Sequence, residues 1–304
     1  MIFNYNVEGQ VKIIMYQYIK GLIDNAPEIY KKGAAKATPA PNHLYYIRDP
    51  DCEDTELVDK KEKEEYYTLT AQCLYLSKRG RPDIQQAVAF HCTRVNNPDK
   101  DDQKKLARLI RYLMVTISLS LILSMNNNGI SEWWVDASFA IHDDMKSRTG
   151  ATMSLWQATI YCASKKQKIM TSSSTEAELV GISDALPKIL WCRYFMKAQG
   201  CIVEDVYVYQ DNQSTILLEN NGMKSVGKGS RHIRIKYFFA TDKIKDKEIK
   251  VIYCPTEKML EDFYTKPLQG ALFLKHRNKI MGVEPDDFST YQKEYDAYTK
   301  TIEN

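Results

Sequence analysis

Four acidic residues in the second half of the chain are of a type and order that could do chemistry together. Asp136 lies in the run 133–138, where aromatic and β-branched residues lead into one acid, a pattern typical of a strand. The other three acids are Glu178, Asp211 and Asp262. A carboxylate in an apolar strand is costly unless a cation binds it. We therefore predict that the four carboxylates converge on two divalent metal ions.

Three of these acids also have an ordinary structural explanation. Asp136 could face solvent from an edge strand, and Asp211 could cap the helix that follows it. Asp262 is the weakest candidate by itself, because an Asp on a helix is usually exposed. Only its place in the order of motifs favours a role in the site.

Glu178 is the most informative of the four because of its helical spacing. Positions 182, 185, 186 and 189 share its helix face and are all apolar, which predicts that Glu178 faces the sheet. Glu176 points to the opposite side, where it is expected in solvent near the helix N-terminus. A buried acid among Ile and Leu needs a cation.

The type of donor narrows the choice of metal. Four hard oxygen donors without clustered His or Cys favour Mg²⁺, or Mn²⁺, over Zn²⁺. Two such ions about 4 Å apart can activate a water and stabilise the leaving oxygen in an attack on phosphorus. The sequence thus indicates a site suited to an attack of water on phosphorus.

Composition sets broader limits. At 304 residues, 44% hydrophobic and 27% charged, the chain has room for two domains and is typical of soluble globular proteins. The net charge of +3 means that any nucleic-acid-binding surface must be local. Seven cysteines without a C-x-x-C pair favour a reducing compartment. With no signal peptide and no run long enough for a bilayer, we expect an intracellular protein in a cytoplasmic particle or the nucleus, without a membrane partner.

Periodicity predicts an α/β protein. Apolar spacing indicates a helix over 11–23 and a mostly helical region over 66–118, with Asp99 as a helix N-cap. From 119 the pattern changes to strands, then to a Ser/Thr-rich segment over 172–175, a long helix from its end to about 199 and shorter elements to 265. This order predicts one mixed sheet of five strands with flanking helices. The boundaries that we predict are 1–65, 66–118, 119–270 and a polar tail over 271–304.

Several segments, in order, resemble the ribonuclease H domain of Ty1/copia-type retrotransposon polyproteins. The resemblance covers about 131–270, and the matching segments are Trp-Val-Asp-Ala-Ser-Phe-Ala at 134–140, Ser-Lys-Lys-Gln-Lys at 164–168, Ser-Ser-Thr-Glu-Ala-Glu at 173–178, Asp-Asn-Gln-Ser at 211–214, Arg-His-Ile at 231–233 and Asp-Phe-Tyr-Thr-Lys-Pro-Leu at 262–268. Upstream, 74–84 and 110–113 resemble the connection to the reverse transcriptase, and 1–50 resembles the end of the polymerase.

The resemblance implies a ribonuclease-H-like fold and endonucleolytic cleavage of RNA in an RNA–DNA hybrid, leaving a 5′-phosphate and a 3′-hydroxyl. By motif, the four metal ligands of the family match Asp136, Glu178, Asp211 and Asp262. The partners that it implies are the hybrid and the reverse transcriptase part of the parent polyprotein. No Tyr-x-Asp-Asp polymerase motif occurs in this chain.

Basic and small polar residues near these motifs are candidates for holding the nucleic acid, because phosphate contacts need cations and loop N–H groups. The candidates are Ser138, Lys165, Lys166, Lys168, Asn212, Gln213, Lys228, Arg231 and His232. The lysines could equally form a solvated face, and His232 could be a structural histidine.

Three other functions stay open at this point. The chain could be a nucleic-acid-binding remnant whose site no longer turns over, which shares all four carboxylates. A purely structural connection domain would suit the helical region over 66–118. Fold analogy alone would also allow a transposase or an exonuclease. The motifs at 136–138 and 173–178 favour ribonuclease H.

Overall fold

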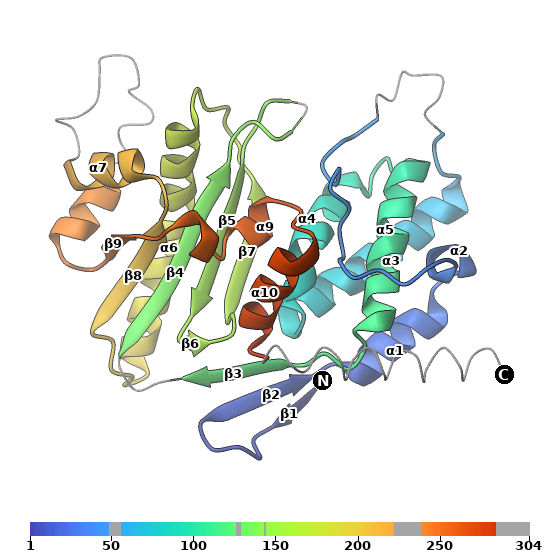
Figure 1. Ribbon diagram of the computed structural model, residues 1–304, viewed down its shortest axis with the longest axis horizontal. Coiled ribbons are helices and arrows are strands. Elements are labelled where there is room, and N and C mark those ends of the chain that lie inside the picture. Colours follow the sequence, from blue (N-terminus) through green and yellow to red (C-terminus); the bar gives the residue numbers. More distant parts are fainter. Residues whose placement is uncertain (49–55, 126–128, 143, 222–238, 284–304) are drawn as a thin grey trace. The chain divides into compact units, whose positions relative to one another are not determined.

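The computed structural model describes residues 1–48, 56–125, 129–142, 144–221 and 239–283. The chain divides into two compact units, shown in Figure 1. The first unit comprises Met1–Ser124 together with Pro267–Asn304, and the second comprises Met125–Lys266.

The second unit is built on a mixed five-stranded sheet. Its strands are β4 (Ile130–Ser138), β5 (Arg148–Ser154), β7 (Tyr161–Lys166), β8 (Asp205–Gln210) and β9 (Lys250–Tyr253). The short strand β6 (Trp156–Gln157) is not part of this sheet. They lie in the order β7-β5-β4-β8-β9. The β7–β5–β4 pairs are antiparallel and the β4–β8–β9 pairs are parallel. The predicted α/β class with a ribonuclease-H-like mixed sheet is confirmed.

Helices lie on both faces of this sheet. The long helix α6 (Ser174–Ala198) covers one face, where Trp133 and Val135 of β4 pack into its apolar stripe. The other helical elements are α7 (Gln213–Asn221), the 3₁₀ turn η3 (Thr256–Lys258) and the short α9 (Asp262–Thr265). A Cβ on Gly150 would lie 2.9 Å from Thr265 Cγ2, whereas its neighbour Thr149 lies beside Gly181 of α6. Because successive strand residues point to opposite faces, α9 lies on the face away from α6.

The first unit is mostly helical, as predicted for 66–118. Its helices are α1 (Tyr16–Asn25), α2 (Glu28–Lys31), α3 (Lys60–Arg79), η1 (Pro82–Ile84), α4 (Gln85–Arg94), α5 (Lys100–Val115) and α10 (Gly270–Met281). Asp99 caps α5 in a capping box, as its place before the apolar stripe predicts. Three antiparallel strands accompany them: β1 (Ile2–Asn4), β2 (Gln10–Ile14) and β3 (Leu121–Met125). None of the described helices has the length and apolarity that crossing a membrane would need.

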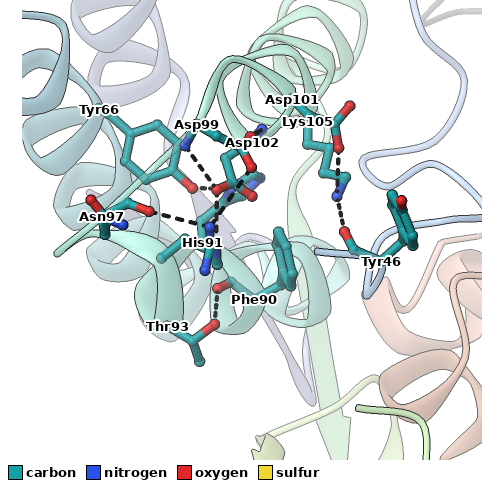
Figure 2. Close-up of polar contacts among 11 residues, drawn as sticks. Tyr46, Tyr66, Phe90, His91, Thr93, Asn97, Asp99, Asp101, Asp102 and Lys105 are labelled. Atoms are coloured by element: carbon teal, nitrogen blue, oxygen red, sulfur yellow. Dashed lines mark hydrogen bonds and ion pairs between the residues drawn. The ribbon is translucent and has the colours of Figure 1, made fainter. Parts of the chain in front are cut away.

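A buried polar cluster ties α3, α4 and α5 together (Figure 2). The Tyr66 hydroxyl lies 2.7 Å from His91 Nδ1, and both side chains are fully buried. Arg94 Nε donates to Asp102 Oδ2 at 2.8 Å. Lys105 Nζ pairs with Asp101 at 2.9 Å and donates to the backbone carbonyl of Tyr46 at 2.6 Å. Every charged group of this cluster therefore has a partner of opposite charge.

Three expectations from the sequence differ from this fold. The helix predicted over 11–23 is a strand to Ile14 followed by α1, because Val11 and Ile13 pair with β3, more than a hundred residues away. The strand predicted to begin the nuclease region at 119 is β3, which pairs with β2 in the first unit. The predicted polar tail contains α10 up to Met281, because Phe273 and Ile280 pack into a core.

Candidate active site

Asp136 is placed by the central strand of the five-stranded sheet. Its side chain is 7% exposed, and it alternates with Val135, so it lies on the face opposite α6. Trp134 anchors this part of β4 by stacking on Tyr209 of β8 with ring centroids 5.0 Å apart. The Thr265 hydroxyl donates to Asp136 Oδ2 at 3.2 Å. The explanation as a solvent-facing edge acid is therefore excluded.

The register of β4 and β8 brings Asp211 beside Asp136. Trp134 pairs with Tyr209 in parallel, so Asp136 and Asp211 each follow their partner by two residues at the same end of the sheet. Ligands in α/β sheets gather at such carboxyl ends of strands. Asp211 is half-buried and accepts a hydrogen bond from the Thr256 hydroxyl at 3.0 Å.

Glu178 reaches the same place from the first turns of α6. The helix begins after Ser173, whose hydroxyl accepts the backbone N–H of Glu176 at 3.2 Å. Glu178 is 6% exposed, and the four apolar residues that share its face are all in the core, as their spacing predicts. Glu176 is half-buried at the helix N-terminus, where it accepts from the Ser172 hydroxyl.

Three of the four predicted carboxylates meet. Asp136, Glu178 and Asp211 each offer an oxygen, and these oxygens all lie within 4.8 Å of one another. Asp262 is not in this group. It is 8% exposed at the start of α9, and its carboxylate pairs with Lys266 Nζ at 2.5 Å. Its charge nonetheless reaches the group, because it raises the pKa of Asp136.

Neutral donors hold Glu178 in position. Gln210 Nε2 and the Thr215 hydroxyl donate to Oε2 at 2.8 and 3.1 Å, and Asn212 Nδ2 donates to Oε1 at 3.1 Å. Gln210 and Thr215 were not among the predicted site residues. The signal that could have found them is their place on either side of Asp211, at a strand end and in the first turn of a helix.

The electrostatics of the acidic group favour the binding of a cation. Burial, then the charges of Asp262 and Asp211, raise the pKa of Asp136 to about 6. Burial is also the main cause that raises the pKa of Glu178 to about 7. Within the described part of the chain, no Lys or Arg forms an ion pair with Asp136, Glu178 or Asp211. Three clustered oxygen donors that repel one another are a good fit to a hard divalent cation.

Two further acids, which sequence reasoning missed, lie near this group. Glu219 is 1% exposed on α7, one helical turn after Thr215, and neither of its carboxyl oxygens has a hydrogen-bond partner among the described residues. Burial and then the charge of Glu178 raise its pKa to about 8. Glu261 is fully buried, and burial, then the charge of Asp136, raise its pKa well above the usual range. Buried acids whose charged form is disfavoured thus extend beyond the predicted ligands.

The candidates for holding nucleic acid are spread around the site. Ser138 ends β4, and its hydroxyl has no hydrogen-bond partner among the described residues. Asn212 supports Glu178, and Gln213 is exposed at the start of α7. Lys165, Lys166 and Lys168 are exposed at the end of β7, where Lys166 pairs with Asp144 at 2.8 Å. Lys228, Arg231 and His232 lie outside the described residues.

The strand order and the acidic group together define a ribonuclease-H-like domain. No family model matches the chain. The chain is 27% identical over 237 residues to a retrovirus-related Pol polyprotein from transposon TNT 1-94 of Nicotiana tabacum, over 78% of this chain and 18% of the relative. It is 30% identical over 229 residues to that from transposon RE1 of Arabidopsis thaliana, over 74% of this chain and 15% of the relative. It is 24% identical over 256 residues to the Ty1-DR5 Gag-Pol polyprotein of Saccharomyces cerevisiae, over 82% of this chain and 14% of the relative.

The chain is thus a relative of the Pol polyproteins of Ty1/copia-type retrotransposons, and it spans less than a fifth of their length. Among solved structures, ribonuclease H1 of Halobacterium salinarum shares 13% identity with a TM-score of 0.31, over 43% of this chain and 90% of that one. A foamy viral protease-reverse transcriptase shares 13% identity with a TM-score of 0.40, over 75% and 28%.

Proposed function

We propose that the second unit is a ribonuclease H that cuts the RNA strand of RNA–DNA hybrids within a retrotransposon polyprotein. The observation that carries this proposal is the meeting of Asp136, Glu178 and Asp211, from three separate elements, with oxygens within 4.8 Å of one another. Paired acids that are buried without a cation are rare in a purely structural domain, because each lowers stability.

The proposed site would hold two Mg²⁺ or Mn²⁺ ions through Asp136, Glu178 and Asp211, with Asp262 as the proposed fourth ligand. When bound, such ions activate a water and stabilise the leaving oxygen of the phosphodiester. The protein fixes the ligands in advance: Gln210, Asn212 and Thr215 orient Glu178, and Thr265 orients Asp136. Oriented carboxylates cost little reorganisation when the site is loaded.

The products that we propose are a 5′-phosphate and a 3′-hydroxyl. Selectivity for the hybrid requires contacts to RNA 2′-hydroxyls on one strand. Ser138 is one candidate, because it ends β4 two residues after Asp136 and its buried hydroxyl has no hydrogen-bond partner among the described residues. Gln213 is exposed beside Asp211 and is the second such candidate. Lys165 and Lys168 would contact phosphates. Because the relatives are far longer, the reverse transcriptase part of a parent polyprotein is a proposed partner.

The test is cleavage of a hybrid with a labelled RNA strand in Mg²⁺, with the same hybrid in EDTA as a blank. Glu178→Gln should lower the rate of cleavage by on the order of a thousandfold or more, since several kcal/mol of metal-assisted stabilisation of the transition state is lost. The matched control is Glu176→Gln, two residues away on the same helix but outside the acidic group. It should cut within a few-fold of the parent.

Three results would contradict the proposal in different ways. Equal cutting by Glu178→Gln and the parent would show that the site is assigned wrongly. No cutting by the parent, together with retained salt-dependent binding of the hybrid, would leave the nucleic-acid-binding remnant as the function. Loss of both cutting and binding would favour a structural role.

A further inference from the structure

An exposed aromatic pair lies on α6 far from the acidic group. The rings of Trp191 and Phe195 are stacked with centroids 5.1 Å apart and an interplanar angle of 10°. Their side chains are 53% and 50% exposed. Lys188 Nζ lies 3.6 Å from the centre of the Trp191 ring. Spacings of three and four residues place the three side chains in one row along the helix.

The fold does not need this row for its core. The opposite stripe of α6, with Ile182, Leu186 and Ile189, already packs on the sheet. Exposed apolar side chains that gather in one patch mark binding surfaces, whereas scattered single ones do not. A stack of this kind is also pre-organised, because it loses little side-chain entropy when a ligand lies against it.

A basic cavity continues the row toward the catalytic end of α6. It measures about 330 Å³ and lies between the edge strand β7 and α6, where Tyr161, Lys165, Lys168 and Asp184 are among its lining residues. Lys188 links the two features, because its Nζ also lies 5.5 Å from the centre of the Tyr161 ring. The aromatic row and the cavity therefore form one continuous surface, which we call the α6 track.

The charge on the track is mostly positive. Lys165, Lys168 and Lys188 form no ion pair with any residue in the described ranges. Asp184 is the one acid among the residues that line the cavity. Unpaired lysines beside ordered aromatic rings are the combination by which proteins hold single-stranded nucleic acid, with phosphates on the cations and bases on the rings.

We infer that the α6 track binds a single-stranded RNA or DNA segment that extends from the hybrid held at the acidic group. This inference rests on the proposed function for its substrate. Trp191 lies thirteen positions after Glu178, which is about 20 Å along a helix. An extension of several nucleotides can therefore reach the ring pair by way of the cavity. A base that stacks on Trp191 replaces the Lys188 ammonium, which is then free to bind a phosphate.

The experiment measures binding rather than cleavage, so that it stays informative if the nuclease proposal fails. Fluorescence anisotropy gives the Kd, without divalent ions, for a blunt hybrid and for the same hybrid with a ten-nucleotide extension. Four extended substrates, with RNA or DNA at either the 5′ or the 3′ end, identify the strand that binds. The parent should bind at least one extended hybrid more tightly than the blunt one.

Trp191→Ala should weaken binding of that extended hybrid about tenfold and leave the blunt hybrid unchanged, because one base loses its stacking partner. Trp191→Phe should restore most of the difference. Lys165→Ala with Lys168→Ala should weaken it further and reduce the dependence of Kd on salt. The matched control is Tyr67→Ala, which removes a ring that is 60% exposed on α3 of the other unit.

Three results would overturn the inference. Equal loss on blunt and extended hybrids would make the track a general backbone contact. Unchanged binding by Trp191→Ala would show that the ring pair does not bind nucleic acid, and a protein partner would become the better explanation. If the extension gives the parent no gain in affinity, then the single-stranded segment is not a ligand of the protein. Circular dichroism of each variant confirms that a loss does not come from unfolding.

Discussion

The two units of this chain treat buried charge in opposite ways. In the first unit, the fully buried guanidinium of Arg81 donates two hydrogen bonds of 2.8 Å to Asp83, and Arg94 pairs with Asp102. In the second unit, Asp136 and Glu178 are buried without a cation partner among the described residues. Both units bury charge, but Asp136 and Glu178 differ from the paired acids of the first unit, and from Asp262 with Lys266, because no described cation pairs with them.

The difference separates structural from functional acids. A buried pair that is complete fixes the arrangement of its elements and adds little to affinity for anything outside. A buried acid without a partner lowers stability, and natural proteins keep such groups where function needs them. Burial alone therefore does not identify a site. The absence of an internal partner, together with convergence on one point, does.

The largest effect is expected where a complete pair is broken. Arg81→Met should lower the free energy of unfolding of the first unit by about 3–5 kcal/mol, because Asp83 would stay buried without its cation. The Thr116 carbonyl would also lose the hydrogen bond of 2.9 Å that Arg81 donates. Hydrogen exchange of peptides from the first unit measures the change. The double variant Arg81→Met with Asp83→Leu should recover part of the loss, and no recovery would show that the pair is not the cause.

The second prediction is that a bound metal ion supplies the positive charge that the acidic group lacks. Mg²⁺ at about a hundred times its Kd should stabilise the second unit by about 2.7 kcal/mol, because the ion binds only the folded site. The first unit should not respond, since its buried acids are already paired. Hydrogen exchange with and without Mg²⁺ separates the two units. Asp136→Asn should lose most of the gain, and equal gains in both units would count against a specific site.

The third prediction concerns pH in the first unit. Burial, and then the charge of Lys105, lower the pKa of His91 to about 3, whereas the unfolded value is near 6.5. The unfolded chain therefore binds a proton between these values that the folded unit does not. Stability from His91 is present above pH 6.5 and falls as the pH drops toward 3, by up to about 1.4 kcal/mol per pH unit. His91→Gln should reduce this slope in urea titrations at pH 6.5, 5.5 and 4.5. An unchanged slope would show that a group other than His91 takes up the proton on unfolding.

Much of the site was predictable because its signals are local. The strand over 133–138 follows from its aromatic and β-branched residues, and the buried side of α6 follows from helical spacing after Glu178. Asp211 was predictable as a strand-end acid. Helical spacing did not single out Asp262, and the ion pair that it forms with Lys266 was not predicted from the sequence.

What failed depends on contacts between distant segments. Val11 and Ile13 suit either a helix or a strand, and only pairing with β3 decides between them. The helix α10 was missed because polar residues around Phe273 interrupt the apolar spacing of the helix face that is buried. Glu261 was missed because nothing in its neighbourhood shows that β5 approaches α9 closely at Gly150 and encloses it.

The smallest effect is expected from removing one charge of the acidic group. In metal-free protein at pH 8, Asp136→Asn should stabilise the second unit by on the order of 1 kcal/mol, because an ionised Asp136 repels Asp211 and Asp262. The folded pKa of about 6 lies above the unfolded value of about 3.8, so the folded unit holds a proton longer as the pH rises. The wild type therefore loses stability as the pH rises from about 4 through 6, and the advantage of the variant should vanish near pH 4. The matched change in the first unit is Asp83→Asn, which should be destabilising at both pH values because it removes the charge partner of Arg81. If Asp136→Asn were also destabilising at pH 8, the contrast between an incomplete and a complete set of buried charges would be wrong. The two acids would then both be structural.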